Sequence, residues 1–109
     1  MFRVIAGLTL CVGLAATAAA QDAKVASGEK LFVDHKCTLC HSVGDKGNKK
    51  GPLDGVATKL KAEEIREWLT DAKGMTAKMK ATRKPEMKAY TLSKADVDAL
   101  AAYLMTLKK

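Results

Sequence analysis

The chain has 109 residues, which leaves room for one domain. Its 19 Lys and Arg residues exceed its 12 Asp and Glu residues, so the formal net charge is +7, and an acidic partner surface or membrane headgroups would attract it. The charge does not favour nucleic-acid binding, because the lysines are spread along the chain and are not clustered with aromatic residues.

The N-terminal segment has the pattern of a secretory signal peptide. A positive Arg3, an uncharged apolar run and the small residues Ala18-Ala19-Ala20 precede an expected cleavage before Gln21. We therefore predict that residues 1–20 are removed as a signal peptide, that residues 21–109 form the mature domain, and that the protein is exported to a bacterial periplasm or its equivalent. An uncleaved membrane anchor is the alternative, because the uncharged run approaches the length of a bilayer span.

Residues 22–36 have the apolar periodicity of a helix, and Asp22 is a candidate cap for its start. Gly28 lies inside this predicted helix. Because glycine is costly in a helix interior, we expect another helix to pass close to it.

The two cysteines that remain after cleavage both lie in the C-T-L-C-H run of residues 37–41. Two thiols three positions apart can each add across a vinyl group of a porphyrin, and the histidine after the second is carried under the ring, where its imidazole can bind the iron. The spacing therefore predicts covalent haem attachment, and haem would stabilise a domain too short for a large core. A zinc site that includes His35 is an alternative, but ligands packed so closely fit tetrahedral zinc badly. We otherwise expect His35 to be an ordinary exposed residue.

Residues 42–57 contain four glycines and Pro52, so they are predicted to form a loop that wraps the haem. We expect the carbonyl of Pro52 to accept the Nδ1 proton of His41 and to hold the imidazole in the tautomer that ligates iron. A turn proline without this task is the alternative.

Residues 61–73 are predicted to form a second helix that ends at Gly74. Its apolar face carries Trp68, which we expect to pack on haem or on the other helices. Residues 93–108 form the clearest amphipathic helix, with Ser93 as its N-cap.

The intervening stretch of residues 74–92 has no convincing period, and it contains Met75, Met79 and Met87. A thioether is a soft, neutral ligand that suits haem iron. We choose Met87 as a ligand, because the residues around it look like the extended, turning segment that must reach the face opposite the histidine. Met79 is the second choice and Met75 the third, and filling a gap in the core is the alternative for each.

Together these residues resemble the small monohaem class I c-type cytochromes, over nearly all of residues 21–109. The features that carry the resemblance are Gly28 and Phe32, Cys37, Cys40 and His41, Gly51-Pro52, Pro85-x-Met87 with Tyr90, and Leu100 and Tyr103.

The resemblance implies a small all-α fold of three to five helices wrapped around one covalently bound haem c, with the N- and C-terminal helices crossed. It implies thioether bonds from Cys37 and Cys40, axial ligation of the iron by His41 and Met87, and a role as an electron carrier, not an enzyme. We also expect Leu100 and Tyr103 of the last helix to meet Gly28 and Phe32 of the first.

The chain departs from the family pattern at three places. Lys88 stands where a proline often follows the ligand methionine, the loop after Gly51-Pro52 is one residue shorter, and Lys61 replaces a Ser or Thr before the second helix. The first departure bears on how rigidly Met87 is held.

An iron held from both faces has no vacant position for a reactant, so we expect a monomeric periplasmic shuttle of single electrons. Its redox partners would have acidic docking surfaces, attracted by the lysines of the methionine segment and the wrapping loop, which are Lys78, Lys80, Lys84, Lys88, Lys46, Lys49 and Lys50. A haem-based small-ligand sensor or binding protein with a labile or open sixth position is one alternative. An electron-entry subunit of a membrane redox complex, with the signal kept as an anchor, is another.

Overall fold

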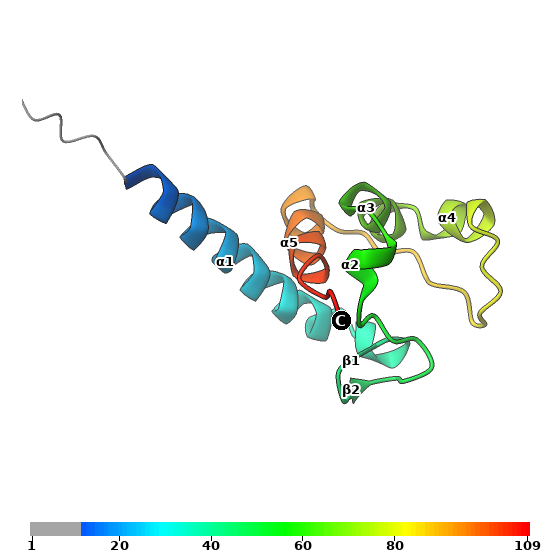
Figure 1. The fold of residues 1–109 in the computed structure, drawn as a ribbon. Helices are drawn as coiled ribbons and strands as arrows, with labels where there is room; N and C mark the ends of the chain where they lie inside the picture. Colours follow the sequence, from blue (N-terminus) through cyan, green and yellow to red (C-terminus); the bar gives the residue numbers. More distant parts are fainter. Residues whose placement is uncertain (1–11) are drawn as a thin grey trace, which may run out of the picture.

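The computed structural model describes the backbone of residues 12–109 and the side chains of residues 17–109. The helices and strands, in chain order, are α1 (Val12–Asp34), the short 3₁₀ helix η1 (Cys37–Leu39), β1 (Ser42–Val43), β2 (Lys46–Gly47), α2 (Val56–Lys59), α3 (Ala62–Thr70), α4 (Ala72–Lys78) and α5 (Lys94–Leu104) (Figure 1). This mostly helical architecture confirms the predicted fold class. Arg3 and the rest of residues 1–11, including most of the predicted signal peptide's apolar run, lie outside the described residues.

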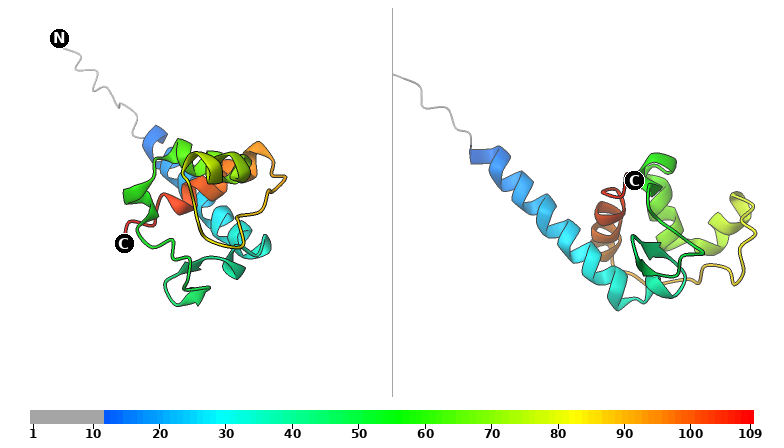
Figure 2. Two further views of the ribbon diagram at one scale, coloured as in Figure 1. Left: turned by 90° about the vertical axis from the view of Figure 1, so that its right-hand side faces the viewer. Right: turned by 60° about the horizontal axis from the view of Figure 1, so that its bottom comes forward.

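The first helix begins ten residues earlier than predicted, and its N-terminal half stands clear of the other helices (Figure 2). Asp22 is an exposed residue inside α1, so the prediction that it caps the helix start is wrong for the full chain. The alanine-rich run before Gln21 has the highest intrinsic helix propensity, and no glycine or proline separates it from the amphipathic part. Within residues 12–109, no helix has the length and hydropathy needed to cross a membrane.

The first and last helices cross at Gly28, as predicted. A Cβ atom at Gly28 would overlap the carbonyl oxygen of Ala99 and would lie 2.6 Å from the Cβ of Tyr103. The rings of Phe32 and Tyr103 meet edge to face beside the crossing, with centroids 5.9 Å apart. Leu100, at 1% exposure, lies in the core that the two helices share with α3.

The predicted second helix is broken in two at Asp71. Its carboxylate accepts a hydrogen bond of 3.1 Å from the backbone N–H of Gly74, so Asp71 caps the start of α4. Gly74 therefore lies within a helix and does not end one, and the helix continues to Lys78 through a region that we expected to be irregular. A capping carboxylate can outweigh the cost of a glycine one turn later, because it satisfies a backbone donor that would otherwise be unpaired.

The last helix begins as predicted and ends earlier. The hydroxyl of Ser93 accepts a hydrogen bond of 3.1 Å from the N–H of Asp96, which confirms the N-cap. The helix ends at Leu104, not at residue 108. Just after this end, the hydroxyl of Thr106 donates a hydrogen bond to the carbonyl of Tyr103. The loop predicted for residues 42–57 is present, with one two-stranded pairing between β1 and β2 and the first residues of α2 at its end.

Gly28→Ala tests the helix crossing. The added methyl group would meet a backbone carbonyl that cannot rotate away, so we expect the free energy of unfolding to fall by about 1–3 kcal/mol, although alanine is the better helix former. Chemical denaturation of the haem-loaded protein measures this loss. Glu29→Ala, at the next and exposed position, is the control and should change stability by less than about 0.5 kcal/mol. A Gly28→Ala protein as stable as the wild type would contradict the close crossing.

Candidate haem-binding site

A cavity of about 500 Å³ lies between the end of α1, the loop that follows it, α3, α5 and the segment before α5. Its apolar walls include Phe32, Leu53, Ile65, Trp68, Leu69, Leu100 and Leu104. Trp68 is thus half-buried at the cavity, as expected for a residue that packs on a ligand. The volume and the apolar lining are typical of a pocket for a large organic group.

The C-T-L-C-H run is folded so that all three of its reactive side chains line this cavity. Lys36 adopts a left-handed backbone conformation with a φ of 57°, which ends α1 and starts η1. The carbonyl of Cys37 then accepts hydrogen bonds from the N–H groups of Cys40, at 3.2 Å, and His41, at 2.9 Å. This tight turn places Cys37, Cys40 and His41 at one wall of the cavity. Neither cysteine forms a disulfide within the described residues, and burial raises the pKa of Cys37.

The imidazole of His41 is held by the carbonyl of Gly51, not by that of Pro52 as predicted. The distance from Nδ1 to the Gly51 oxygen is 3.0 Å. Ser42 explains the difference, because it pairs with the following loop: its N–H donates to Gly51 at 3.1 Å and its carbonyl accepts from Leu53 at 2.9 Å. This pairing turns the Gly51 carbonyl toward the histidine. With Nδ1 donating its proton, Nε2 keeps a lone pair that can bind a metal.

The surroundings of His41 favour its neutral form. Burial lowers the pKa of the imidazole, its hydrogen bond to Gly51 opposes that shift, and the charge of Arg83 adds to it. Gly51 lies against both the Cys40 carbonyl and the Arg83 guanidinium, since a Cβ atom at Gly51 would overlap them. The neutral imidazole is the form that ligates iron.

Of the three methionines considered as ligands, the structure brings only Met87 to the cavity. It is half-buried and packs against the hydrophobic core. Met75 is buried in the core at 2% exposure, and Met79 is 47% exposed, and neither lines the cavity. Met87 therefore lines the same cavity as the C-T-L-C-H run, whereas Met79 and Met75 do not.

Several residues at the cavity were not anticipated from the sequence. Arg83 and Glu86 line it, and no sequence signal identified them apart from their nearness to Met87. His35, expected to be exposed, is half-buried with its ring 6.0 Å from that of Tyr90 and nearly perpendicular to it, at 86°. The Nζ atom of Lys88 lies 5.0 Å from the centre of the same Tyr90 ring. Burial is the main cause of the raised pKa of Tyr90.

The zinc alternative finds no support among the described residues. Across residues 12–109, no group of three or more His, Cys, Asp and Glu side chains is arranged to hold a metal ion. His35 contacts the Tyr90 ring, as described above.

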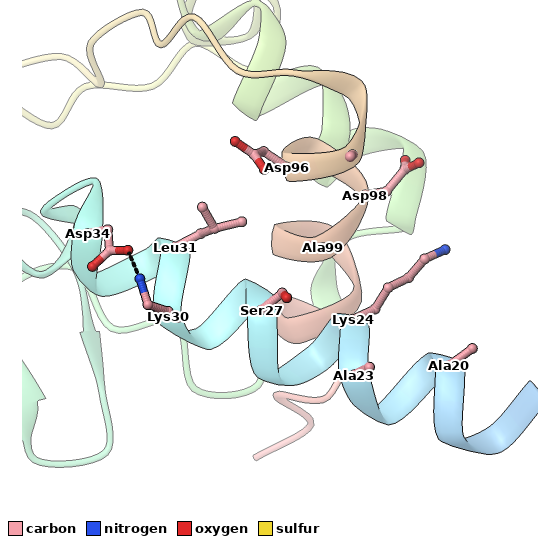
Figure 3. A pocket seen from close by; sticks show the side chains of 11 residues that line it. Ala20, Ala23, Lys24, Ser27, Lys30, Leu31, Asp34, Asp96, Asp98 and Ala99 are labelled. Carbon is pink, nitrogen blue, oxygen red and sulfur yellow. Dashed lines mark hydrogen bonds and ion pairs between the residues drawn. The ribbon is translucent and has the colours of Figure 1, made fainter.

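A second hollow, of about 630 Å³, is an open groove between α1 and the start of α5 (Figure 3). Small side chains such as Ala23, Ser27 and Ala99 form its floor, and charged side chains, among them Lys24 and the ion pair between Lys30 and Asp34, lie around it. No Cys, His or Met side chain lines this groove. It therefore offers no covalent attachment point and no axial ligand for a haem.

The 500 Å³ cavity, in contrast, fits a haem. It combines apolar walls, two thiols on adjacent turns, an imidazole held through Nδ1 and a thioether. The cytochrome c family model matches residues 25–108 of the chain, which includes every element from the second half of α1 to α5. Comparisons with curated proteins and with solved structures gave no significant match. The chain thus belongs to the cytochrome c family, whose members hold a covalently bound haem c and carry electrons instead of acting as enzymes.

Proposed function

We propose that this protein shuttles single electrons in the periplasm through one haem, bonded to Cys37 and Cys40 and ligated by His41 and Met87. The observation that carries the proposal is that these four side chains line the same apolar cavity. Bound there, the haem iron supplies one-electron redox chemistry. Two protein ligands leave no open position for a substrate or a small gas, so the role is that of a carrier.

The residues around the site set the reduction potential. The thioether of Met87 favours ferrous iron more than a second imidazole would, and the apolar walls disfavour the additional positive charge of the ferric state. Gly51 keeps His41 in the ligating tautomer through the bond of 3.0 Å to Nδ1. These features together favour a relatively high potential.

Met87→Ala tests the axial ligand, and Met79→Ala is the matched control on the same segment. Ferric haem with a sulfur ligand has a weak near-infrared charge-transfer band, which we expect in the wild type and in Met79→Ala and expect to be lost in Met87→Ala. A band that survives in Met87→Ala would rule out this ligand. Rapid binding of carbon monoxide by the reduced wild type at neutral pH would instead favour the sensor alternative.

We propose further that residues 1–20 are removed on export and that the carrier acts as a monomer. The cleavage is supported by the sequence pattern before Gln21 and by the exposure of Ala18, Ala19 and Ala20, which a peptidase would have to reach.

The intact mass of the protein purified from the exporting cell tests the cleavage and the attachment together. We expect the mass of residues 21–109 plus that of one haem. A mass that includes residues 1–20 would favour the anchored subunit of a membrane complex. A mass equal to the polypeptide alone would contradict covalent attachment.

We propose that positive charge near the cavity steers acidic redox partners. Lys36, Arg83 and Lys88 line the cavity, whereas Lys78 and Lys84 form ion pairs with Glu67 and Glu86 at 3.6 and 2.9 Å. We therefore expect the first three to influence an approaching partner more than Lys78 and Lys84 do.

The rate of electron transfer to a physiological partner, measured across ionic strength, tests this steering. We expect the rate constant to fall as salt rises, and Lys88→Gln to weaken that dependence more than Lys84→Gln. A rate constant that stays flat or rises with salt would exclude steering.

A further inference from the structure

The segment that carries Met87 lacks the support that the rest of the site has. Residues 79–92 form a long irregular connection from α4 to α5 (Figure 1). In the described part of the chain, no backbone to backbone hydrogen bond involves residues 82–92. The segment is also mostly exposed, and no proline follows the methionine. Side chains must therefore hold Met87 in place.

Apart from Arg83, whose guanidinium lies against Gly51, few side chains connect this segment to the rest of the molecule. The ion pair between Lys84 and Glu86 is local, since both residues belong to the segment. Met87 itself and Leu92 pack on the core, which is apolar contact without directional constraint. A directional contact near Met87 is that of Tyr90, whose ring meets the ring of His35 edge to face at 6.0 Å.

His35 is a firm anchor for that ring. Its backbone N–H donates to the carbonyl of Leu31 at 2.9 Å, which continues the hydrogen bonding of α1 by one residue. It lies two residues before Cys37, on the side of the cavity where the haem is attached. The contact between His35 and Tyr90 therefore links the attachment side to the methionine side.

Lys88 extends this link to the residue next to Met87. Its Nζ atom lies 5.0 Å from the centroid of the Tyr90 ring, within the range of a cation–π interaction. A proline at position 88 would restrict the backbone by fixing φ. The lysine instead restrains residues 88–90 through its contact with an aromatic ring that is itself anchored.

We propose that Lys88, Tyr90 and His35 form a stack that positions Met87 at the cavity, in the place of the proline that the family often has after its ligand methionine. The three are positioning residues, since they act through Met87. The inference rests on the proposed function, because it requires Met87 to be the axial ligand.

Competition by imidazole for the sixth position of the ferric haem-loaded protein tests the stack. Imidazole binds once Met87 leaves, so its apparent affinity reports how firmly the methionine is held. We expect Tyr90→Leu, which removes both contacts, to raise that affinity about 10-fold, and Lys88→Gln, which removes the exposed cation–π contact, about 3-fold. The near-infrared band should be lost at a lower imidazole concentration in both variants.

Two controls separate positioning from general stability. Tyr90→Phe keeps the ring and should bind imidazole within about 2-fold of the wild type. Lys84→Gln removes a lysine from the same segment without touching the stack, and it should also stay within about 2-fold. Lys88 is exposed, so Lys88→Gln keeps the test available if Tyr90→Leu does not mature.

Two results would overturn the inference, and they differ. If Tyr90→Leu and Lys88→Gln bind imidazole like the wild type while Met87→Ala binds it much more tightly, the stack does not position Met87, although the ligand assignment survives. If Met87→Ala itself binds imidazole like the wild type, Met87 is not the ligand, and the stack and the ligand proposal fail together.

Discussion

The close crossing of α1 and α5 at Gly28 is the constraint on which the site depends. No side chain separates the two backbones there, so the helix axes approach until the Ala99 carbonyl lies against Gly28. Because α1 continues directly into the C-T-L-C-H run, this contact also determines where the thiols lie relative to α5. Leu100 and Leu104 of α5 then form a wall of the cavity. The absence of a side chain at Gly28 thus fixes the position of the cavity wall from α5 relative to the cysteines that follow α1.

The two sides of the cavity are held by different means. On the histidine side, backbone hydrogen bonds predominate, and Cys37, Ser42 and Gly51 all take part. The Gly51 carbonyl accepts from the backbone N–H of Ser42 and from the ring of His41. On the methionine side, side chains hold a segment without backbone pairing. The histidine is thus the more rigidly placed of the two proposed ligands, and ligand exchange is expected first on the side of Met87.

Positive charge near the cavity acts both on the groups inside the cavity and on molecules that approach it. Arg83 lies close enough to His41 to contribute to its lowered pKa, and the same charge would disfavour ferric iron nearby. Arg83, Lys36 and Lys88 are all exposed, so salt would screen their effect on an approaching partner. Under the proposed function, the same positive charges would affect both the attraction of a partner and the reduction potential.

The sequence by itself determined the features that depend on local patterns. The C-T-L-C-H spacing, the apolar periodicity of the first and last helices, the Ser93 cap and a glycine suited to a helix crossing each depend on residues within one or two turns, and they predicted the all-α fold and the cofactor. Only the tertiary structure decided that Gly51 and not Pro52 faces His41, and that His35 meets Tyr90. These contacts depend on how segments distant along the chain pack together. The local propensities of one segment do not predict which residues of another segment it will contact.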